Sequence, residues 1–342
     1  MRFEVQQADL IKALTALSRI IVKVQRDSIL QNVLIKKIDD NKIRLIASNM
    51  TTSLRFDVEA QNVDIEEDVL YNLNLLTAII NKTKDTIIFN DNYIKTKDSK
   101  YKISYVNAKE FPDIQFDHEE GIELECENLK TAINKTAYAA SDVQGVLSGI
   151  YFNGTEVVAI DGKRLALSKI NSELDNFILS KSAGYELVKL FNKDTLKVSI
   201  KNQTVYFYND SITFKTTLIA GKYPDYKGLL PQELKYTIKF NKNDLLNAID
   251  ILTPVMDAKM MLCSLMIDKN IMTITAINKE EVGTTSINIK SNLESNKVLK
   301  FNAKYLIEML NNFENEVEMK INDSYATVFE DGENYSMVMQ IT

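Results

Sequence analysis

One structural pattern occurs six times along the chain, and this repetition constrains the fold more than any single residue does. In each copy a short strand leads into an amphipathic helix and then into strands separated by polar turns. The odd-numbered copies cover residues 1–60, 121–170 and 235–289, with turns expected at residues 39–41, 153–154 and 268–270. The even-numbered copies have their helices near residues 75–80, 187–191 and 305–310. Because the spacing barely changes, pairs of copies predict three similar domains, at residues 1–117, 120–231 and 234–342.

Apolar periodicity indicates helices that cover one face of antiparallel sheets. Leu10, Leu14 and Leu17 form the stripe of a helix packed on a sheet, whereas Lys12 falls off that stripe. Residues 212–217 alternate between apolar and polar side chains, as in a strand that is covered on one side. The combination predicts an α+β protein in which each domain is a duplicated βαβββ unit.

Composition predicts a soluble, cytoplasmic protein. The chain has 342 residues, of which 45% are hydrophobic and 26% are charged, enough for two or three domains. No stretch approaches the roughly 18 uncharged apolar residues of a membrane span, and the first residues lack the apolar core of a secretory signal. Cys126 and Cys263 lie far apart without metal-ligand spacing, which fits a reducing compartment better than a disulfide framework.

Charge separates the expected helices from the rest of the chain. The formal net charge is −6, which taken alone argues against nucleic acid. Counted over residues 8–19, 72–84, 128–140, 180–193, 242–252 and 302–313, the expected helices carry +6 and leave −12 elsewhere. Basic helices on one side of three linked domains could gather around a polyanion. The alternative is that these lysines only solvate an exposed helix face, and both interpretations stay open at this point.

Several sequence segments resemble the bacterial DNA polymerase III beta subunit, the sliding clamp. They include residues 149–152 (Gly-Ile-Tyr-Phe), 159–166 (Ala-Ile-Asp-Gly-Lys-Arg-Leu-Ala) and 218–226 (Leu-Ile-Ala-Gly-Lys-Tyr-Pro-Asp-Tyr). Residues 1–3 and 301–306 (Phe-Asn-Ala-Lys-Tyr-Leu) are similar to the same family, so the resemblance runs from the first strand to the last.

The resemblance implies a ring that works by topology. Members of this family have the DNA clamp fold and form a head-to-tail homodimer of six similar domains, with helices inside and sheets outside, around duplex DNA. The ring holds DNA polymerase III on its template, is loaded by a clamp loader, and uses no cofactor and no catalysis. Two-fold closure joins the first domain of one subunit to the third domain of the other. The positions that the resemblance places near this seam are Ile251, Leu252, Pro254 and Val255.

The resemblance also implies a pocket between the second and third domains, where partner proteins insert a short apolar linear motif. Carried over position by position, its wall consists of Leu147, Gly162, Lys163, Arg164, Leu165, Pro224, Leu229, Met260, Asn302, Tyr305, Val338 and Met339. Apolar side chains and free backbone groups are what an extended peptide requires. For Leu165 and Leu229 a plain core role is the open alternative, whereas Arg164 and Tyr305 favour a functional role.

DNA contacts are expected to be independent of sequence and to go to phosphates. The candidates are Lys12, Arg19, Arg26, Lys82, Lys130, Lys135, Gln144 and Lys189. The tail departs from the family, because its usual proline is Met339 and its usual arginine is Ile341. This change predicts a more apolar and pliable pocket, since methionine adapts its shape.

Enzymatic interpretations find little support in the sequence. His118 is the only histidine and lies in an acidic loop, and no serine or cysteine occupies a Gly-x-Ser-x-Gly context. No metal site is expected. The alternative to a ring is a scaffold of clamp-like domains that binds peptides without encircling DNA.

Overall fold

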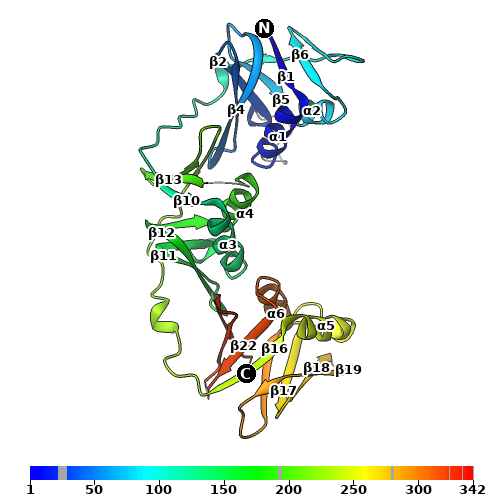
Figure 1. Ribbon diagram of the computed structural model, residues 1–342, viewed down its shortest axis with the longest axis vertical. Coiled ribbons are helices and arrows are strands. Elements are labelled where there is room, and N and C mark those ends of the chain that lie inside the picture. Colours follow the sequence, from blue (N-terminus) through cyan, green and yellow to red (C-terminus); the bar gives the residue numbers. More distant parts are fainter. Residues whose placement is uncertain (22–28, 192–194, 279–280, 323, 333, 342) are drawn as a thin grey trace. The chain divides into compact units, whose positions relative to one another are not determined.

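The chain forms two compact units. The computed structural model describes residues 1–21, 29–191, 195–278, 281–322, 324–332 and 334–341 (Figure 1). Unit 1 comprises Met1–Glu127 and Glu186–Leu218, and unit 2 comprises Asn128–Tyr185 and Ile219–Thr342. The central third of the chain is thus shared between the two units, and the division into three domains stays a prediction.

Each of the six expected helices is present in the described part of the chain. They are α1 (Gln7–Leu17), α2 (Leu73–Ile80), α3 (Cys126–Ala137), α4 (Lys181–Leu190), α5 (Lys242–Leu252) and α6 (Ala303–Leu310). An asparagine side chain caps three of them by accepting a backbone N–H of the first turn: Asn72 for α2, Asn241 for α5 and Asn302 for α6. Within the units, α1 packs beside α2 and α5 beside α6 (Figure 1). None of the described helices has the length and apolarity needed to cross a membrane.

The expected charge separation is largely wrong, because several helices end earlier than the sequence suggested. The observed helices hold seven lysines and six carboxylates, a net charge of +1. Arg19, Lys82 and Lys84 lie in the turns after α1 and α2, and α3 begins early enough to include Glu127. Cations just beyond a helix C-terminus interact favourably with the helix dipole, which is reason enough for basic residues there.

Unit 1 is built on one sheet of thirteen strands. Its main path runs in the order β10-β13-β14-β15-β4-β1-β6-β7-β8, with β2, β3, β5 and β9 paired alongside. The bounds are β1 (Arg2–Gln6), β2 (Asn32–Asp39), β3 (Lys42–Ser48), β4 (Thr52–Asp64), β5 (Val69–Asn72), β6 (Thr86–Asn90), β7 (Tyr93–Lys95), β8 (Lys100–Lys102), β9 (Val106–Asn107), β10 (Ile122–Glu125), β13 (Thr195–Lys201), β14 (Thr204–Tyr208) and β15 (Ile212–Thr217). Antiparallel pairing of β15 with β4 joins strands from the first and second thirds of the chain into one sheet.

Unit 2 contains a seven-stranded and a four-stranded sheet. Their orders are β11-β12-β24-β23-β22-β16-β20 and β19-β18-β17-β21. The bounds are β11 (Gly149–Ile160), β12 (Arg164–Ser180), β16 (Tyr236–Asn241), β17 (Leu262–Asp268), β18 (Ile271–Asn278), β19 (Glu281–Asn288), β20 (Lys290–Ser291), β21 (Lys297–Asn302), β22 (Glu316–Ile321), β23 (Ala326–Glu330) and β24 (Tyr335–Met339). Pairing of β12 with β24 connects the second and third thirds of the chain. Helices on antiparallel sheets confirm the expected α+β class.

Burial follows the predicted apolar stripes. Leu10, Leu14 and Leu17 of α1 are fully buried, whereas Lys12 is exposed. In β4 the side chains of Leu54 and Phe56 lie in the core, so the residues between them face the opposite side of the sheet.

One predicted turn is wrong. The dipeptide Asn153-Gly154 was expected to connect two strands, but it lies inside β11. Gly154 has a φ of +64°, and the register of β11 against β12 shifts on both sides of it. A glycine in the left-handed region suits a β-bulge as well as a turn, so the dipeptide bends a long hairpin instead of beginning a new one.

Candidate functional site

A tight turn between β11 and β12 carries one of the segments that resemble the clamp family. The carboxylate of Asp161 accepts the backbone N–H groups of Lys163 at 2.8 Å and Arg164 at 2.9 Å. Gly162 has a φ of +84°, which favours glycine at this position. Because both Gly162 and Lys163 are exposed, the turn presents backbone to solvent at the end of a rigid hairpin.

Arg164 ties this turn to α6. Its Nε donates to Asp161 at 2.9 Å, its Nη1 donates to Glu308, and its guanidinium carbon lies 4.4 Å from the ring centroid of Tyr305 and 5.5 Å from that of Tyr138. Burial opposes the charge on Arg164, whose side chain is 6% exposed, but the hydrogen bonds and charges of Glu308 and Asp161 outweigh that effect and raise its pKa. The guanidinium is therefore satisfied inside the protein, and Arg164 acts as a positioning residue.

The C-terminal tail is held by its backbone. Three successive N–H groups each donate to a carbonyl of a different segment at 2.8 Å: those of Met339, Gln340 and Ile341 to Lys163, Tyr325 and Lys300, respectively. A proline at position 339, which the resemblance suggests, could not donate the first of these bonds. The methionine of this chain therefore adds a backbone link between the tail and the turn.

The segment that follows Gly221 is anchored by two tyrosines. The ring of Tyr223 stacks on that of Tyr151 with centroids 4.7 Å apart. The hydroxyl of Tyr226 donates to the carboxylate of Glu156 and accepts from the Asn153 amide at 2.8 Å. Pro224 lies between these anchors and is exposed, so both ends of the Tyr-Pro-Asp-Tyr segment are fixed and its middle faces solvent.

The twelve predicted pocket residues all lie in unit 2 but differ in accessibility. Exposed positions are Gly162, Lys163, Pro224, Leu229 (50%), Met260 (58%) and Met339 (37%). Half-buried positions are Leu147, Asn302 and Tyr305. Arg164, Leu165 and Val338 are buried, the last two completely. Leu165 and Val338 therefore lie in the core and offer no surface of their own.

Contacts connect several of these positions. Tyr305 lies over Arg164, the Met339 N–H reaches the Lys163 carbonyl, and Asn302 caps α6, which carries Tyr305. Sequence reasoning missed the partners Asp161, Glu308 and Tyr138. Asp161 and Glu308 each lie three residues from a predicted site residue, a spacing that could have indicated them. Tyr138 has no comparable signal, because its ring approaches Arg164 only through the fold.

The DNA-contact candidates are spread over both units. Lys12 lies on α1, Arg19 and Lys82 follow α1 and α2, and Gln144 precedes the short 3₁₀ turn Val146–Ser148; all four are exposed. Lys130 and Lys135 are half-buried on α3. Lys189 on α4 forms an ion pair with Glu186 at 3.0 Å, so its charge is partly neutralised. Arg26 lies outside the described residues.

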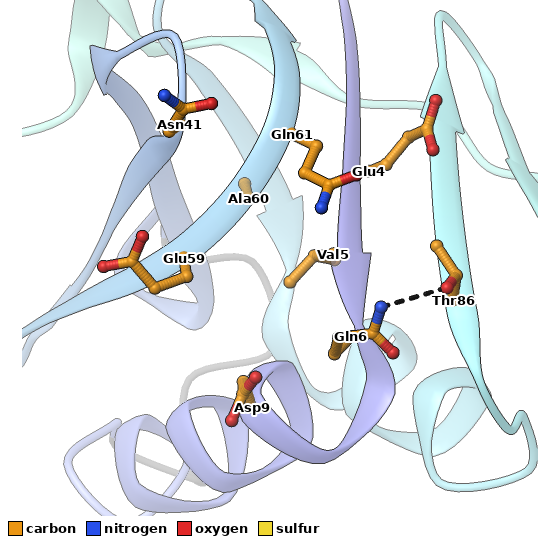
Figure 2. A pocket seen from close by; sticks show the side chains of 9 residues that line it. All are labelled: Glu4, Val5, Gln6, Asp9, Asn41, Glu59, Ala60, Gln61 and Thr86. Atoms are coloured by element: carbon orange, nitrogen blue, oxygen red, sulfur yellow. Dashed lines mark hydrogen bonds between the residues drawn. The ribbon is translucent and has the colours of Figure 1, made fainter.

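An acidic hollow marks a face of unit 1 that is unsuited to DNA. Its volume is about 420 Å³, and the carboxylates of Glu4, Asp9 and Glu59 line it together with Gln6 and Thr86 (Figure 2). Figure 2 shows the Gln6 amide donating to the Thr86 hydroxyl, at 3.0 Å. Three carboxylates around one hollow disfavour a polyanion, and Arg2 and Lys42 partly neutralise two of them by pairing with Glu4 and Glu59 at 3.8 and 3.1 Å.

Comparisons with known proteins agree with this architecture. Residues 123–225 match the family model described as DNA polymerase III beta subunit, central domain. A beta sliding clamp of Buchnera aphidicola is 26% identical and aligns with 98% of this chain and 97% of its own length. A beta sliding clamp of Helicobacter pylori is 27% identical over 91% of this chain and 88% of its own length. The chain is thus similar to beta sliding clamps over nearly its full length, and residues 123–225 match the central domain of the DNA polymerase III beta subunit.

Solved structures of this family share the fold over the whole chain. The Helicobacter pylori beta clamp bound to a DNA ligase peptide has a TM-score of 0.85 at 27% identity, with complete coverage of both chains. A sliding clamp from Bartonella birtlesii bound to griselimycin has a TM-score of 0.92 at 20% identity, also with complete coverage. Because the Bartonella birtlesii clamp is only 20% identical, its similarity shows the fold alone. Together they confirm the expected clamp fold.

The predicted seam residues surround the C-terminus of α5. Ile251 is 68% exposed, and Pro254 is exposed as well, whereas Val255 is half-buried and Leu252 belongs to the core of unit 2. A side chain built at Gly283 of β19 would meet Leu252 and Val255 at 3.0 and 3.3 Å. The seam candidates therefore lie against β19, the outermost strand of the four-stranded sheet.

Proposed function

We propose that this chain is one subunit of a cytoplasmic, ring-shaped sliding clamp. Two copies join head to tail around duplex DNA and tether a replicative polymerase and other partners for processive DNA replication. The observation that carries the proposal is the match to beta sliding clamps over almost the full chain, in sequence and in fold. All three thirds of the chain are needed for a ring of six similar domains, and the match includes all three.

The ring acts by topology and not by catalysis. Two groups that could serve as nucleophile or base are engaged in packing instead. Burial raises the pKa of the Cys263 thiol to about 12, and the ring of His118 stacks on that of Tyr208. A thiol with a raised pKa is a poor nucleophile at neutral pH. The proposal includes no cofactor and no metal.

Ring closure is supported by an unprotected sheet edge. β19 (Glu281–Asn288) pairs with β18 on one side and ends the four-stranded sheet on the other. It is eight residues long and contains no lysine or proline, the residues that usually protect an edge from pairing. Ile251 and Val282, exposed at 68% and 65%, add apolar surface near this edge. We assign this surface to contact with the first third of a second copy.

DNA passes through the ring without sequence recognition. Exposed residues of the helix layer, namely Lys12, Arg19, Lys82 and Gln144, are the contacts we propose first, and the half-buried Lys130 and Lys135 and the ion-paired Lys189 are weaker ones. Since the helices carry little net charge, we expect few phosphate contacts and loose binding. Loose contact suits a ring that slides.

Retention on DNA tests the function directly. Clamps loaded onto a nicked circular plasmid should stay bound through gel filtration in high salt and should leave once a restriction enzyme makes the plasmid linear. Salt screens the phosphate contacts, so only topology keeps the ring on a circle. Equal loss from circular and linear DNA would exclude a ring. A strict monomer at micromolar concentration in light scattering would instead favour the peptide-binding scaffold.

Partner proteins are proposed to insert a short apolar motif into the predicted pocket of unit 2. The Helicobacter pylori beta clamp was solved bound to a DNA ligase peptide, which supports the same use here. The exposed apolar side chains of Leu229, Met260 and Met339 are the surface available to such a motif. The anchored turn at Gly162 and Lys163 offers backbone groups beside them.

Peptide binding should depend on the exposed members of this set. We expect Met260→Glu and Leu229→Glu each to weaken a clamp-binding peptide at least about tenfold, because a carboxylate in an apolar contact must be desolvated. Fluorescence anisotropy with a labelled polymerase peptide measures this. Met50→Glu, which changes an equally exposed methionine of unit 1, is the matched control and should leave affinity unchanged. If Met260→Glu and Leu229→Glu both bind the peptide like the parent, the peptide site does not include these residues.

A further inference from the structure

A row of polar side chains crosses the helix-free face of the unit 1 sheet. Directly paired positions on five neighbouring strands are, in order across β10, β13, β14, β15 and β4, Glu123, Lys197, Tyr208, Thr213 and Arg55. Directly opposed residues of antiparallel strands point to the same face of the sheet. Because Leu54 and Phe56 of β4 are buried in the core, Arg55 and its row lie on the other face.

Arg55 is a largely buried cation without a carboxylate of its own. The nearest carboxylate, Asp57, is engaged by Arg44, whose Nε and Nη2 each donate to one of its oxygens at 2.8 Å. The Nε of Arg55 lies 4.0 Å from Asp57, beyond hydrogen-bond distance, and its side chain is only 15% exposed. Two guanidinium groups therefore share one carboxylate, and burial without a full ionic partner lowers the pKa of Arg55.

A second polar group beside Arg55 is also unsatisfied. Thr213 is completely buried, and its hydroxyl has no hydrogen-bond partner among the described residues; the same holds for the Arg55 Nε. The two residues are direct cross-strand neighbours. A buried donor left without an acceptor costs about 1–3 kcal/mol. Two neighbouring buried donors thus lack a hydrogen-bond acceptor among the described residues.

Arg55 adjoins a cavity of ligand size, whereas Thr213 lies beneath it and does not line the cavity. Its volume is about 480 Å³, and Arg55, Lys197 and Tyr208 line it together with His118, whose ring stacks on Tyr208 with centroids 3.7 Å apart. Small-molecule sites span roughly 300–1,000 Å³. The carboxylates in its lining, Glu123 and Asp210, are exposed, where water screens them. The buried end of the cavity is thus cationic and its walls are aromatic.

We propose that this cavity of unit 1 binds a small organic oxyanion, a carboxylate or a phosphate monoester on a ring-sized body. Arg55 donates charge-assisted hydrogen bonds to the anion, and the body of the ligand lies along His118 and Tyr208. The site is separate from the peptide pocket, which lies in unit 2, and it does not depend on ring closure.

The single histidine provides a local reporter for this proposal. In a protein labelled with ¹³C-histidine, His118 gives the only imidazole signals. Phenyl phosphate, benzoate and uncharged phenol are titrated separately into the full chain. We expect a saturable shift of the His118 signals with at least one of the two anions and not with phenol. A response to one anion alone identifies the source of the oxyanion, and no saturable response to either, or an equal response to phenol, overturns the proposal.

Matched variants distinguish the site from general electrostatics. Arg55→Gln should weaken binding of the anion about tenfold or more, since it removes charge-assisted hydrogen bonds. Lys42→Gln removes a positive charge from an exposed pair with Glu59 on the same unit and should have no effect. Arg55→Lys is a second variant that keeps the charge in case Arg55→Gln does not fold, and it should also bind more weakly because the planar fork is lost. Unchanged affinity in folded Arg55→Gln and Arg55→Lys would overturn the assignment.

Discussion

Ile251→Glu is expected to convert the protein into a folded monomer that no longer stays on circular DNA. The side chain is 68% exposed at the C-terminal end of α5, so a glutamate is readily solvated in the single chain. In the proposed dimer the same position is enclosed beside β19, where a carboxylate without a partner costs several kcal/mol. Light scattering should report about half the mass of the parent, and retention on nicked plasmid should fall to the level seen with linear DNA.

A control on the same unit makes this result specific to the seam. Met266→Glu changes another exposed apolar residue, on β17 in the same four-stranded sheet, and should leave the dimer and its retention intact. Circular dichroism of both variants should match that of the parent. A dimeric Ile251→Glu protein would show that the subunits meet elsewhere, and a monomeric Met266→Glu protein would extend the interface over the sheet face.

The sequence predicted the presence and starts of the helices better than it predicted their ends. Each of the six helices starts within two residues of its expected position, because its strand, its cap and its apolar stripe are all local signals. Their ends were less predictable: Lys82 continues the helical composition of α2, yet the chain turns at Asp85, which has a φ of +61°. At Asn153-Gly154 the local signal was real, but only the pairing with β12 decides between a turn and a bulge.

The sequence predicted which residues belong to the candidate site, but it did not predict the contacts between them. The resemblance supplied Arg164 and Tyr305, which lie 4.4 Å apart in the structure. It did not distinguish Met260, which is exposed, from Leu165 and Val338, which are fully buried. Leu165 and Val338 lie on the paired strands β12 and β24, and this pairing joins residues more than a hundred positions apart. Tyr138 is close to Arg164 for the same reason, since its hydroxyl donates to Ser336 of β24.

Arg164→Ala is expected to destabilise unit 2 by about 2–4 kcal/mol, since breaking a buried ion pair leaves its carboxylate partners uncompensated. Asp161 is 13% exposed, so little water could replace the lost guanidinium. Glu308 is 32% exposed, so water offsets part of the loss of its ion pair. The stacking on Tyr305 is lost as well. In differential scanning calorimetry the transition of unit 2 should move down by roughly 5–15 °C.

Two further variants separate the charge of Arg164 from its shape. Arg164→Lys keeps the positive charge but cannot serve Asp161, Glu308 and the Tyr305 ring at once, so we expect an intermediate loss. Lys163→Ala alters the neighbouring exposed residue and should shift the transition little, because the Lys163 backbone makes the bonds to Asp161 and Met339. If Arg164→Ala melts like the parent, the turn does not depend on α6. In that case the exposed pocket surface at Gly162 and Met339 must be held by the β12–β24 pairing alone.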